Sequence, residues 1–458
     1  MDPILSNDAT DLRRLMTTGA LSAEDLMAAT LDQIATVNGT ANAIVSLRPE
    51  DALLDEARAC DQTPKDRPLS GLPIAVKDLA NVAGLPTSMG SPLFAGQVAH
   101  ASDIMVQRMQ DAGAIVIGKT NTPEFGLGSH TYNPVHGATQ NAILPGMSAG
   151  GSSGGAAVAL ALNMVSIADG SDMMGSLRNP AGWNGVYGMR PTWGLVPSEP
   201  VGDTFLHQLS TNGPMARTPR DLALLLSVQS GADPRQPHGL PRFELEQNLE
   251  VDIKGARIGW LADWGGAYLM EEGVINHCEA ELTRFGVAGA IIEPVAPPMS
   301  AAEIWEAWTT LRSWSVASGL ETLYAQEKTR AHLKPAAIWE IERGRKLSAM
   351  EVQRASVIRS NWFKAAHELF QSYDALVLPS AQCWPFPIDW DWPKEIAGQS
   401  MDTYHRWMEV VIPVSLIGLP SVAVPLRPKP RPMGLQLFGP RGSDLKLLRL
   451  AQIWHQAL

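Results

Sequence analysis

Two glycine-rich loops that carry serines, separated by one short apolar run, constrain this chain of 458 residues more than any other feature. The first loop spans 150–155 and sets two serines between two pairs of glycines. Glycine suits a backbone that turns sharply and lets another group approach closely. The run 156–162 contains good helix formers and no helix breaker, which predicts a short buried helix. The second loop, 169–178, contains Ser176, so the pattern predicts that two serine hydroxyls come together, a setting that suits a nucleophile.

A strand, a helix and a second strand are predicted ahead of these loops. Residues 71–77 form a short apolar run in which Ile74 and Val76 suit a strand, 102–112 have helical periodicity, and 114–118 are apolar. Strand, helix and strand in this order indicate a crossover connection with parallel pairing. Lys77 ends the first strand, where a lysine is ordinarily solvated, so its position alone indicates no function.

Further motifs extend this pattern over nearly the whole chain. They lie at 71–78 (GLPIAVKD), 118–125 (GKTNTPEF), 150–155 (GGSSGG), 170–178 (GSDMMGSLR), 213–218 (GPMART), 418–420 (GLP) and 432–436 (PMGLQ). In this order they resemble the amidase-signature hydrolases, a family that cleaves amides with a Ser–Ser–Lys triad. One glycine loop alone would be a weak signal, whereas several separate motifs in the right order are specific. The resemblance is weakest between residues 240 and 379.

The resemblance implies an α/β fold, a single large domain over 1–458 with a central mixed, mostly parallel, twisted β-sheet flanked by helices. The signature core that carries the triad is expected at 68–225. A variable helical region is expected at 240–400, where it would wall the substrate pocket. The tryptophans of that region are interpreted first as core or helix-packing residues, because Trp buries a large area. They include Trp305, Trp308, Trp314, Trp339 and Trp362.

By resemblance, Ser176 is the nucleophile, Ser152 the bridging acid and base, and Lys77 the general base. In the family the bridging serine follows a cis peptide, which here would be the Gly151–Ser152 bond. A lysine acts as a base only where burial keeps it neutral. No histidine lies in the glycine loops or beside Ser176, so chymotrypsin-like chemistry has no anchor in this sequence.

The family pattern also implies an oxyanion hole of backbone N–H groups. These belong to Met173, Met174, Gly175 and Ser176. Relatives mostly have Gly where Met174 stands, so the donors survive only if Met174 adopts the backbone conformation of the loop. Ser210 and Ser415 stand where the family often has Asp and Asn. These departures concern substrate preference rather than the reaction.

Five positions are expected to support the loops or to contact the substrate. Ser153, Asp172 and Arg178 are assigned a supporting role, with Asp172 and Arg178 forming a pair if they lie close together. Gly126 and Met174 are assigned to the substrate-binding surface. The resemblance implies no metal site and no cofactor, and no paired His, Asp or Glu spacing typical of a metal site occurs.

We therefore expect an enzyme, an amidase that hydrolyses a carboxamide C–N bond through an acyl-enzyme. The adjacent methionines and the tryptophans favour a small apolar or aromatic amide as its substrate. Three alternatives stay open. A glutaminase-type chain resembling the A subunit of tRNA amidotransferases would need partner chains and a polar, charged pocket. A hydrolase of urea-like amides, such as allophanate or biuret, would also favour charged groups there. A catalytically silent scaffold is the third, and the intact triad argues against it.

Charge and cysteine usage limit the partners and the compartment. The net charge is −11 with no long basic run, which argues against binding nucleic acid or an anionic membrane surface. The cysteines, Cys60, Cys278 and Cys383, have neither metal-site nor disulfide spacing, which favours a reducing compartment. The N-terminal residues lack the pattern of a signal peptide. We expect a cytoplasmic protein, and the resemblance implies a possible homodimer.

Overall fold

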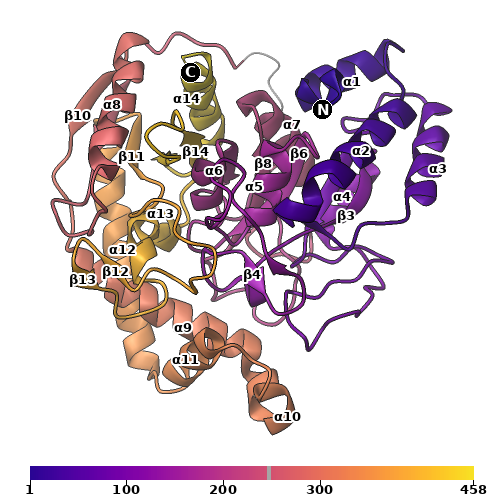
Figure 1. Ribbon diagram of the computed structural model, residues 1–458. Helices are drawn as coiled ribbons and strands as arrows, with labels where there is room; N and C mark the ends of the chain where they lie inside the picture. Colours follow the sequence, from indigo (N-terminus) through magenta and orange to yellow (C-terminus); the bar gives the residue numbers. More distant parts are fainter. Residues whose placement is uncertain (245–248, 458) are drawn as a thin grey trace.

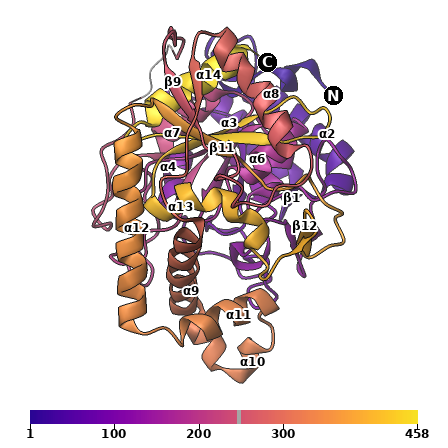
Figure 2. The same ribbon diagram turned by 90° about the vertical axis from the view of Figure 1, so that its left-hand side faces the viewer.

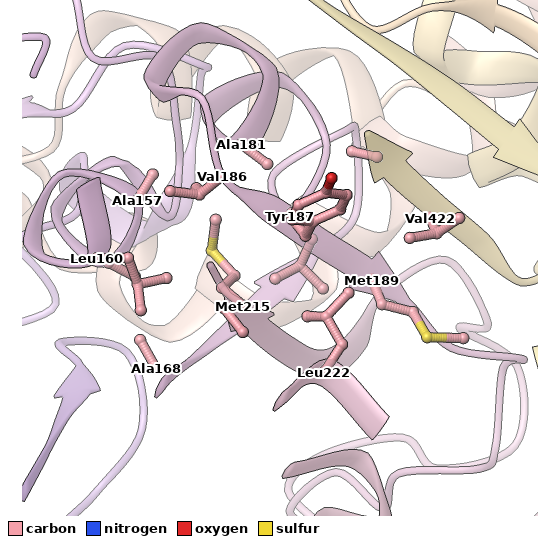
Figure 3. Packing of buried hydrophobic residues seen from close by; sticks show 14 of the residues in the cluster. Ala157, Leu160, Ala168, Ala181, Val186, Tyr187, Met189, Met215, Leu222 and Val422 are labelled. Atoms are coloured by element: carbon pink, nitrogen blue, oxygen red, sulfur yellow. The ribbon is translucent and has the colours of Figure 1, made fainter. Parts of the chain in front are cut away.

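The helix after the first glycine loop lies where only small residues fit. In the computed structural model, α5 (Gly154–Ala161) is almost entirely buried and contacts strands of two sheets. A side chain at Gly155 would collide with the backbone of Asn121, so glycine is required for this close approach. In Figure 3, Leu160 of this helix points toward Met215 in the core. The predicted buried helix is therefore confirmed.

The structure describes residues 1–244 and 249–457 (Figure 1). Residues 245–248, which belong to the helical region predicted at 240–400, lie outside the described residues. The last residue of the predicted domain 1–458 also lies outside them.

An eight-stranded sheet forms the centre of the protein, with the strand order β10-β9-β11-β15-β14-β7-β8-β6. Its strands are β6 (Ile167–Asp172), β7 (Tyr187–Arg190), β8 (Thr211–Ala216), β9 (Arg257–Trp260), β10 (Ile291–Pro294), β11 (Ala375–Pro379), β14 (Ser421–Pro425) and β15 (Gly434–Phe438). Helices cover both of its faces in Figures 1 and 2. The predicted single α/β domain with a central mixed sheet flanked by helices is thus confirmed.

The expectation that this sheet is mostly parallel is wrong. Only β10 with β9 and β9 with β11 pair in parallel, whereas the five other pairings are antiparallel. The physical reason is the path of the chain: β14 and β15 are joined by the short segment 426–433, and a connection of that kind makes antiparallel neighbours. This pair lies between β11 and β7, so that β15 is antiparallel to β11 and β14 is antiparallel to β7.

A second sheet has the order β1-β3-β2 and contains the predicted crossover. Its strands are β1 (Ile44–Val45), β2 (Pro73–Lys77) and β3 (Ile115–Thr120). As predicted, β2 and β3 pair in parallel, and α4 (Ile104–Asp111) connects them. At the end of β2, the N–H of Lys77 donates to Asp169 Oδ1 of β6 at 3.0 Å. This contact brings the lysine to the second glycine loop.

Helices flank the sheets at both ends of the molecule (Figure 1). They are α1 (Ala9–Thr17), α2 (Ala23–Ala41), α3 (Glu50–Asp61), α6 (Asn179–Asn184), α7 (Pro219–Gln229), α8 (Val274–Val287), α13 (Ile412–Ile417) and α14 (Asp444–Gln456). The side chains of Ser22 and Thr218 accept the N–H groups of Asp25 and Asp221, so α2 and α7 are capped at their N-termini.

Four helices extend away from the sheets and form what we call the helical limb (Figures 1 and 2). They are α9 (Ala301–Ala325), α10 (Glu327–Arg330), α11 (Pro335–Gly344) and α12 (Ala349–Leu369). Trp308 and Trp362 of the limb are fully buried, as expected of helix-packing residues, whereas Trp339 is 38% exposed. The remaining short elements are η1 (Pro3–Ser6), η2 (Glu124–Gly126), η3 (Arg406–Val411), β4 (Tyr132–Asn133), β5 (Gly137–Ala138), β12 (Glu395–Ile396) and β13 (Gln399–Ser400).

Candidate active site

Lys77 is held in the interior among hydroxyl groups. Its Nζ lies 2.7 Å from Ser152 Oγ, 2.9 Å from Ser153 Oγ and 3.1 Å from Ser171 Oγ. The side chain is only 1% exposed, and among the described residues it forms no ion pair. The Gly151–Ser152 peptide that leads into Ser152 is cis, as the resemblance implies. The structure thus brings Lys77, Ser152 and Ser153 together and adds Ser171, which we had not assigned to the site.

This environment favours a neutral lysine. Burial lowers the pKa of Lys77 to about 7, and the carboxylates of Asp169 and Asp172 oppose the shift only in part. Asp169 is itself buried, and burial raises its pKa to about 6. Near neutral pH, Nζ is therefore deprotonated in a large fraction of molecules and can accept a proton.

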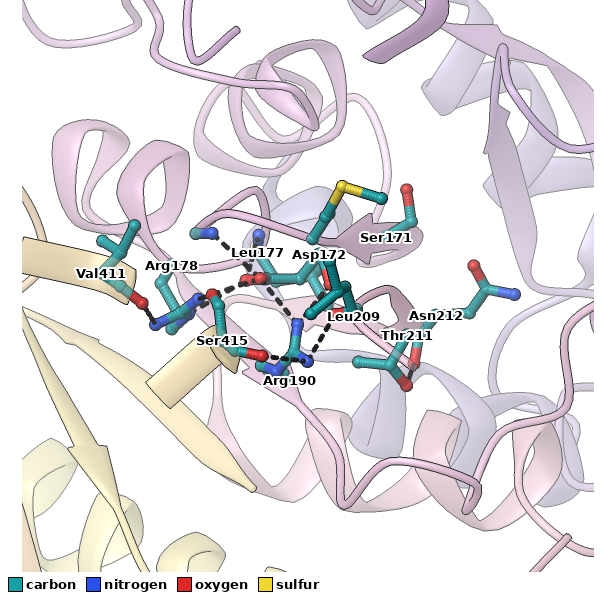
Figure 4. Close-up of polar contacts among 12 residues, drawn as sticks. Ser171, Asp172, Leu177, Arg178, Arg190, Leu209, Thr211, Asn212, Val411 and Ser415 are labelled. Carbon is teal, nitrogen blue, oxygen red and sulfur yellow. Dashed lines mark hydrogen bonds and ion pairs between the residues drawn. The ribbon is translucent and has the colours of Figure 1, made fainter. Parts of the chain in front are cut away.

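Asp172, at the end of β6, anchors the loop that carries Ser176 (Figure 4). Its carboxylate accepts the N–H groups of Gly175 at 2.9 Å and Leu177 at 3.0 Å. It also accepts Arg178 Nη2 at 2.9 Å and Arg190 Nη1 at 3.0 Å. Burial opposes ionisation, but the two guanidiniums hold the pKa of Asp172 well below its usual range. The predicted pair of Asp172 and Arg178 is present, and Arg190 extends it.

Arg178 ties this loop to the C-terminal part of the chain. Its Nη2 donates to Ser415 Oγ at 2.6 Å, and its Nη1 donates to the carbonyl oxygen of Val411 at 3.1 Å and to Gln436 Oε1. The departure at Ser415 from the family pattern is thus accommodated, because its hydroxyl still accepts from Arg178. The second loop begins only after β6 ends, at Met173 rather than at 169 as predicted, since residues 167–172 pair with β8.

The backbone N–H groups of this loop are not equivalent. Within the described residues, those of Met173, Met174 and Ser176 have no hydrogen-bond partner, whereas that of Gly175 is given to Asp172. The expectation that Gly175 supplies a free oxyanion donor is therefore wrong, because the carboxylate already accepts its proton. The left-handed backbone conformation of this loop occurs at Gly175, whose φ is 80°. Met174 has no positive φ, so a residue other than glycine is tolerated at its position.

Ser176 and Ser152 open into one cavity of about 220 Å³. Gly126 and Met174, which we predicted to contact the substrate, belong to its lining, as do Ser210 and Phe125. The side chains that face it from α9 are Arg312, Ser315, Val316 and Leu320. The helical region therefore supplies one wall, but the tryptophans do not line this cavity.

A second cavity of about 660 Å³ adjoins the first and shares the segment 127–129 with it. Trp339, Trp392 and Trp407 line it, together with Tyr132. Neither this aromatic cavity nor Arg312 in the smaller one was predicted from the sequence. A single arginine within the apolar sequence WTTLRSWSV of α9 was the only signal for Arg312.

Three features are absent from the described residues: a hydrogen bond between two site hydroxyls, a cluster of metal ligands and a helix that could span a membrane. Although Ser152 and Ser176 share the cavity, no hydrogen bond joins their hydroxyls in the part of the chain that the structure describes. In residues 1–244 and 249–457, no three side chains of the kinds that ligate metals gather in one place. None of the described helices is both long and apolar enough to cross a membrane.

A serine hydroxyl paired with a buried lysine is a known way to activate a weak nucleophile. Free backbone N–H groups beside a second serine can stabilise the charge that develops on a carbonyl oxygen. Fold and site thus suit the class of α/β enzymes that transfer or hydrolyse acyl groups with a serine.

Comparison with known proteins narrows this class. A family model described as Amidase matches residues 25–448. An acylamidase of Rhodococcus erythropolis is 31% identical over 451 residues, which cover 97% of this chain and 94% of that protein. The A subunit of the glutamyl-tRNA(Gln) amidotransferase of Thermus thermophilus is 32% identical over 98% of this chain and 97% of its own. A solved bacterial aryl acylamidase of the amidase signature family superposes with a TM-score of 0.92 at 25% identity, covering 100% of this chain and 97% of that chain.

The chain therefore belongs to the amidase family, and it is an amide-hydrolysing enzyme. The resemblance read from the sequence motifs is confirmed.

Proposed function

We propose that this enzyme hydrolyses a small carboxamide through an acyl-enzyme on Ser176, with Ser152 as bridging acid and base and Lys77 as general base. Neutral Lys77 draws a proton from Ser152, which takes one from Ser176. Ser176 Oγ then attacks the amide carbon. Ser152 returns the proton to the leaving nitrogen as the C–N bond breaks, and water releases the acid by the same relay.

One observation carries this proposal: the 2.7 Å contact between Lys77 Nζ and Ser152 Oγ, made by a lysine whose pKa burial lowers to about 7. Ser152 lines the same cavity as Ser176. The relay also requires the Ser176 hydroxyl to come within hydrogen-bond distance of Ser152 during the reaction.

The oxyanion of the tetrahedral intermediate is assigned to the N–H groups of Met173, Met174 and Ser176. These donors are free among the described residues, and the bonds of Asp172 to Gly175 and Leu177 hold the loop that presents them. Donors set in advance need no reorganisation when charge develops, and losing one costs about 3 kcal/mol of transition-state stabilisation.

The cavity supports a small substrate with an apolar portion. Its volume of about 220 Å³ is below the range of about 300–1,000 Å³ common for drug-sized ligands. Phe125, Met174, Val316 and Leu320 provide the apolar surface. Relatives named for acyl and aryl acyl amides agree with an apolar or aromatic amide.

A glutaminase-type function stays as a second candidate, because Arg312 places a charged group in the cavity and one relative is an amidotransferase chain. The two functions separate in a simple assay. An enzyme that acts alone hydrolyses a simple amide such as butyramide without partner chains, whereas a glutaminase-type chain turns over glutamine and needs them.

The test of the proposed nucleophile is intact mass and peptide mapping after exposure to a fluorophosphonate. Six serines line the cavity, so the site of the adduct discriminates among them; they are Ser129, Ser152, Ser171, Ser176, Ser210 and Ser315. We expect the adduct on Ser176, its loss in Ser176→Ala, and much slower labelling in Lys77→Met. Ser210→Ala is the matched control and keeps the adduct. An adduct on another serine would refute the assignment.

The cytoplasmic location and the homodimer that the resemblance implies remain part of the proposal. A small-molecule amide is the only partner that the mechanism requires. Light scattering on the purified protein would measure its mass in solution and decide between a monomer and a dimer.

A further inference from the structure

Arg312 is a buried charge that faces the candidate active site. It lies on α9, it is only 2% exposed, and it lines the cavity that contains Ser176. Among the described residues that line this cavity, it is the one that carries a charge. The other lining side chains are apolar or hydroxyl-bearing, so the guanidinium has no counter-charge on the cavity surface.

The three nitrogens of Arg312 are used unequally. Nε donates to Glu340 Oε1 at 2.8 Å, and Nη2 donates to the Tyr404 hydroxyl at 2.8 Å. For Nη1, the acceptor among the described residues is the Met173 sulfur at 3.1 Å. A thioether is a weak acceptor, whereas bonds from a guanidinium to charged oxygens are strong. Nη1 is therefore poorly satisfied, and its partner is an unbranched side chain of the cavity wall that can move aside.

Among the described residues, the carboxylate that pairs with Arg312 does not line the cavity. Glu340 accepts from Arg312 and Tyr404 through Oε1 and from Ser313 through Oε2, so its acceptors are occupied. A second guanidinium, that of Arg343, bonds to Ser313 Oγ at 3.1 Å and makes no ion pair within the described residues. Glu340 therefore neutralises Arg312 from outside the cavity, and no carboxylate among the described lining residues faces Nη1.

We propose that Arg312 is a specificity-determining residue that binds a carboxylate on the substrate, away from the scissile amide, through Nη1. The Met173 side chain gives way to the carboxylate oxygen. The inference rests on the proposed function of Ser176 and narrows its substrate class to small amides with an anionic end. The carboxylate belongs either to the acyl part or to the amine part of the amide, and the test separates these.

The experiment compares kcat/KM for amides that differ only in the carboxylate. For the acyl side, malonamic, succinamic and glutaramic acids are paired with propionamide, butyramide and valeramide. For the amine side, N-acetylglycine and N-acetyl-β-alanine are paired with N-ethylacetamide and N-propylacetamide. We expect an acid to exceed its neutral match by about tenfold or more in one arm, since hydrogen bonds to charged groups have effects of this size.

Variants link that preference to Arg312. Because Arg312→Met alone would leave Glu340 buried without its partner, the main variant is Arg312→Met with Glu340→Gln. Its matched control is Arg345→Met with Glu321→Gln, which removes an exposed pair near the same two helices. We expect the ratio of acid to neutral kcat/KM to fall to about one in the first variant and to stay within about twofold in the control.

A second variant keeps the proposal testable if the first does not fold. Arg312→Lys preserves the charge beside Glu340 but lacks the fork that reaches both Glu340 and the cavity, so the ratio should fall, mainly through a higher KM for the acid. Equal kcat/KM for every acid and its neutral match, or a preference that survives loss of Arg312, would overturn the inference. Neutral amides hydrolysed at the native rate by Ser176→Ala would instead overturn the proposed function.

Discussion

The two walls of the active-site cavity are built in opposite ways. On one side, the segment from β2 to α6 presents the serines, the glycines and the free N–H donors, beside apolar side chains such as Phe125 and Met174. On the other side, α9 of the helical limb presents long side chains, with Val316 and Leu320 beside Arg312. Groups near the backbone have few positions, whereas long side chains have many. Under the proposed function, the reacting groups therefore lie where the chain has least freedom, and the groups that recognise the substrate lie where it has more.

The charged groups of the two walls also differ, in how fully their hydrogen-bonding atoms are used. Asp172 receives two backbone N–H groups and two guanidiniums, so the first wall rests on a fully used carboxylate (Figure 4). Arg312 in the second wall directs Nη1 at the sulfur of Met173, which is a weak acceptor. The bonds of Asp172 therefore hold their loop in place, whereas Arg312 can exchange the Met173 sulfur for a ligand oxygen.

The largest effect is expected on the first wall. Ser176→Ala should lower kcat by at least about 10⁴-fold, as loss of a serine nucleophile does in other hydrolases, with little change in thermal unfolding. Steady-state hydrolysis of butyramide measures this, with Ser210→Ala as the control from the same cavity. Hydrolysis that continues in Ser176→Ala would mean that the two walls do not divide chemistry from recognition as described.

The next effect concerns stability. Asp172→Asn leaves Arg178 and Arg190 without their buried counter-charge and should reduce the free energy of unfolding by about 3–5 kcal/mol. Glu340→Gln in the limb removes the carboxylate from a single guanidinium, that of Arg312, and should reduce the free energy of unfolding by less. Urea denaturation of both variants at pH 7 compares them. If Glu340→Gln proved the more damaging, the limb rather than the loop would be the rigid side.

The pH profile probes Lys77 within the first wall. Because the neutral form is the base and burial lowers the pKa of Lys77 to about 7, kcat/KM should rise about tenfold per pH unit below 7 and level off above it. The stability follows the same sign: between pH 7 and about 10 the unfolded chain binds the proton that folded Lys77 has lost, so unfolding becomes harder as pH rises. A rate that is flat from pH 6 to 8 would exclude a lysine base of this pKa.

The smallest effect is expected on the second wall. Leu320→Ala removes part of the apolar lining contributed by α9 and should change the preference between butyramide and longer aliphatic amides by about tenfold, mainly through KM. Kinetics on a series of amides of increasing chain length would measure it. A loss of kcat as large as that of Ser176→Ala would show that the limb takes part in the chemistry.

Much of the first wall could be predicted from the sequence, because its signals are local. Glycines and apolar runs lie next to one another along the chain, and they predicted α5 and the parallel pair of β2 and β3. The resemblance added the roles of Lys77, Ser152 and Ser176, of which the structure supplies the contact between the first two.

Other features depended on distant parts of the chain. Three of the five antiparallel pairings arise because β14 and β15 lie between β11 and β7, a placement that no local pattern encodes. The N–H of Gly175 is unavailable because the loop folds back on Asp172. Ser171 joined the lysine for a similar reason, since β6 lies beside β2.

The sequence by itself determined the family, the elements around the two glycine loops and the residues that can perform the chemistry. Only the tertiary structure decided which groups face the cavity, most clearly Arg312, which lies more than 130 residues after Ser176 in the sequence and contacts Met173. The physical reason is that backbone conformation depends on neighbouring residues, whereas the lining of a cavity depends on how separate elements pack to bury their apolar faces.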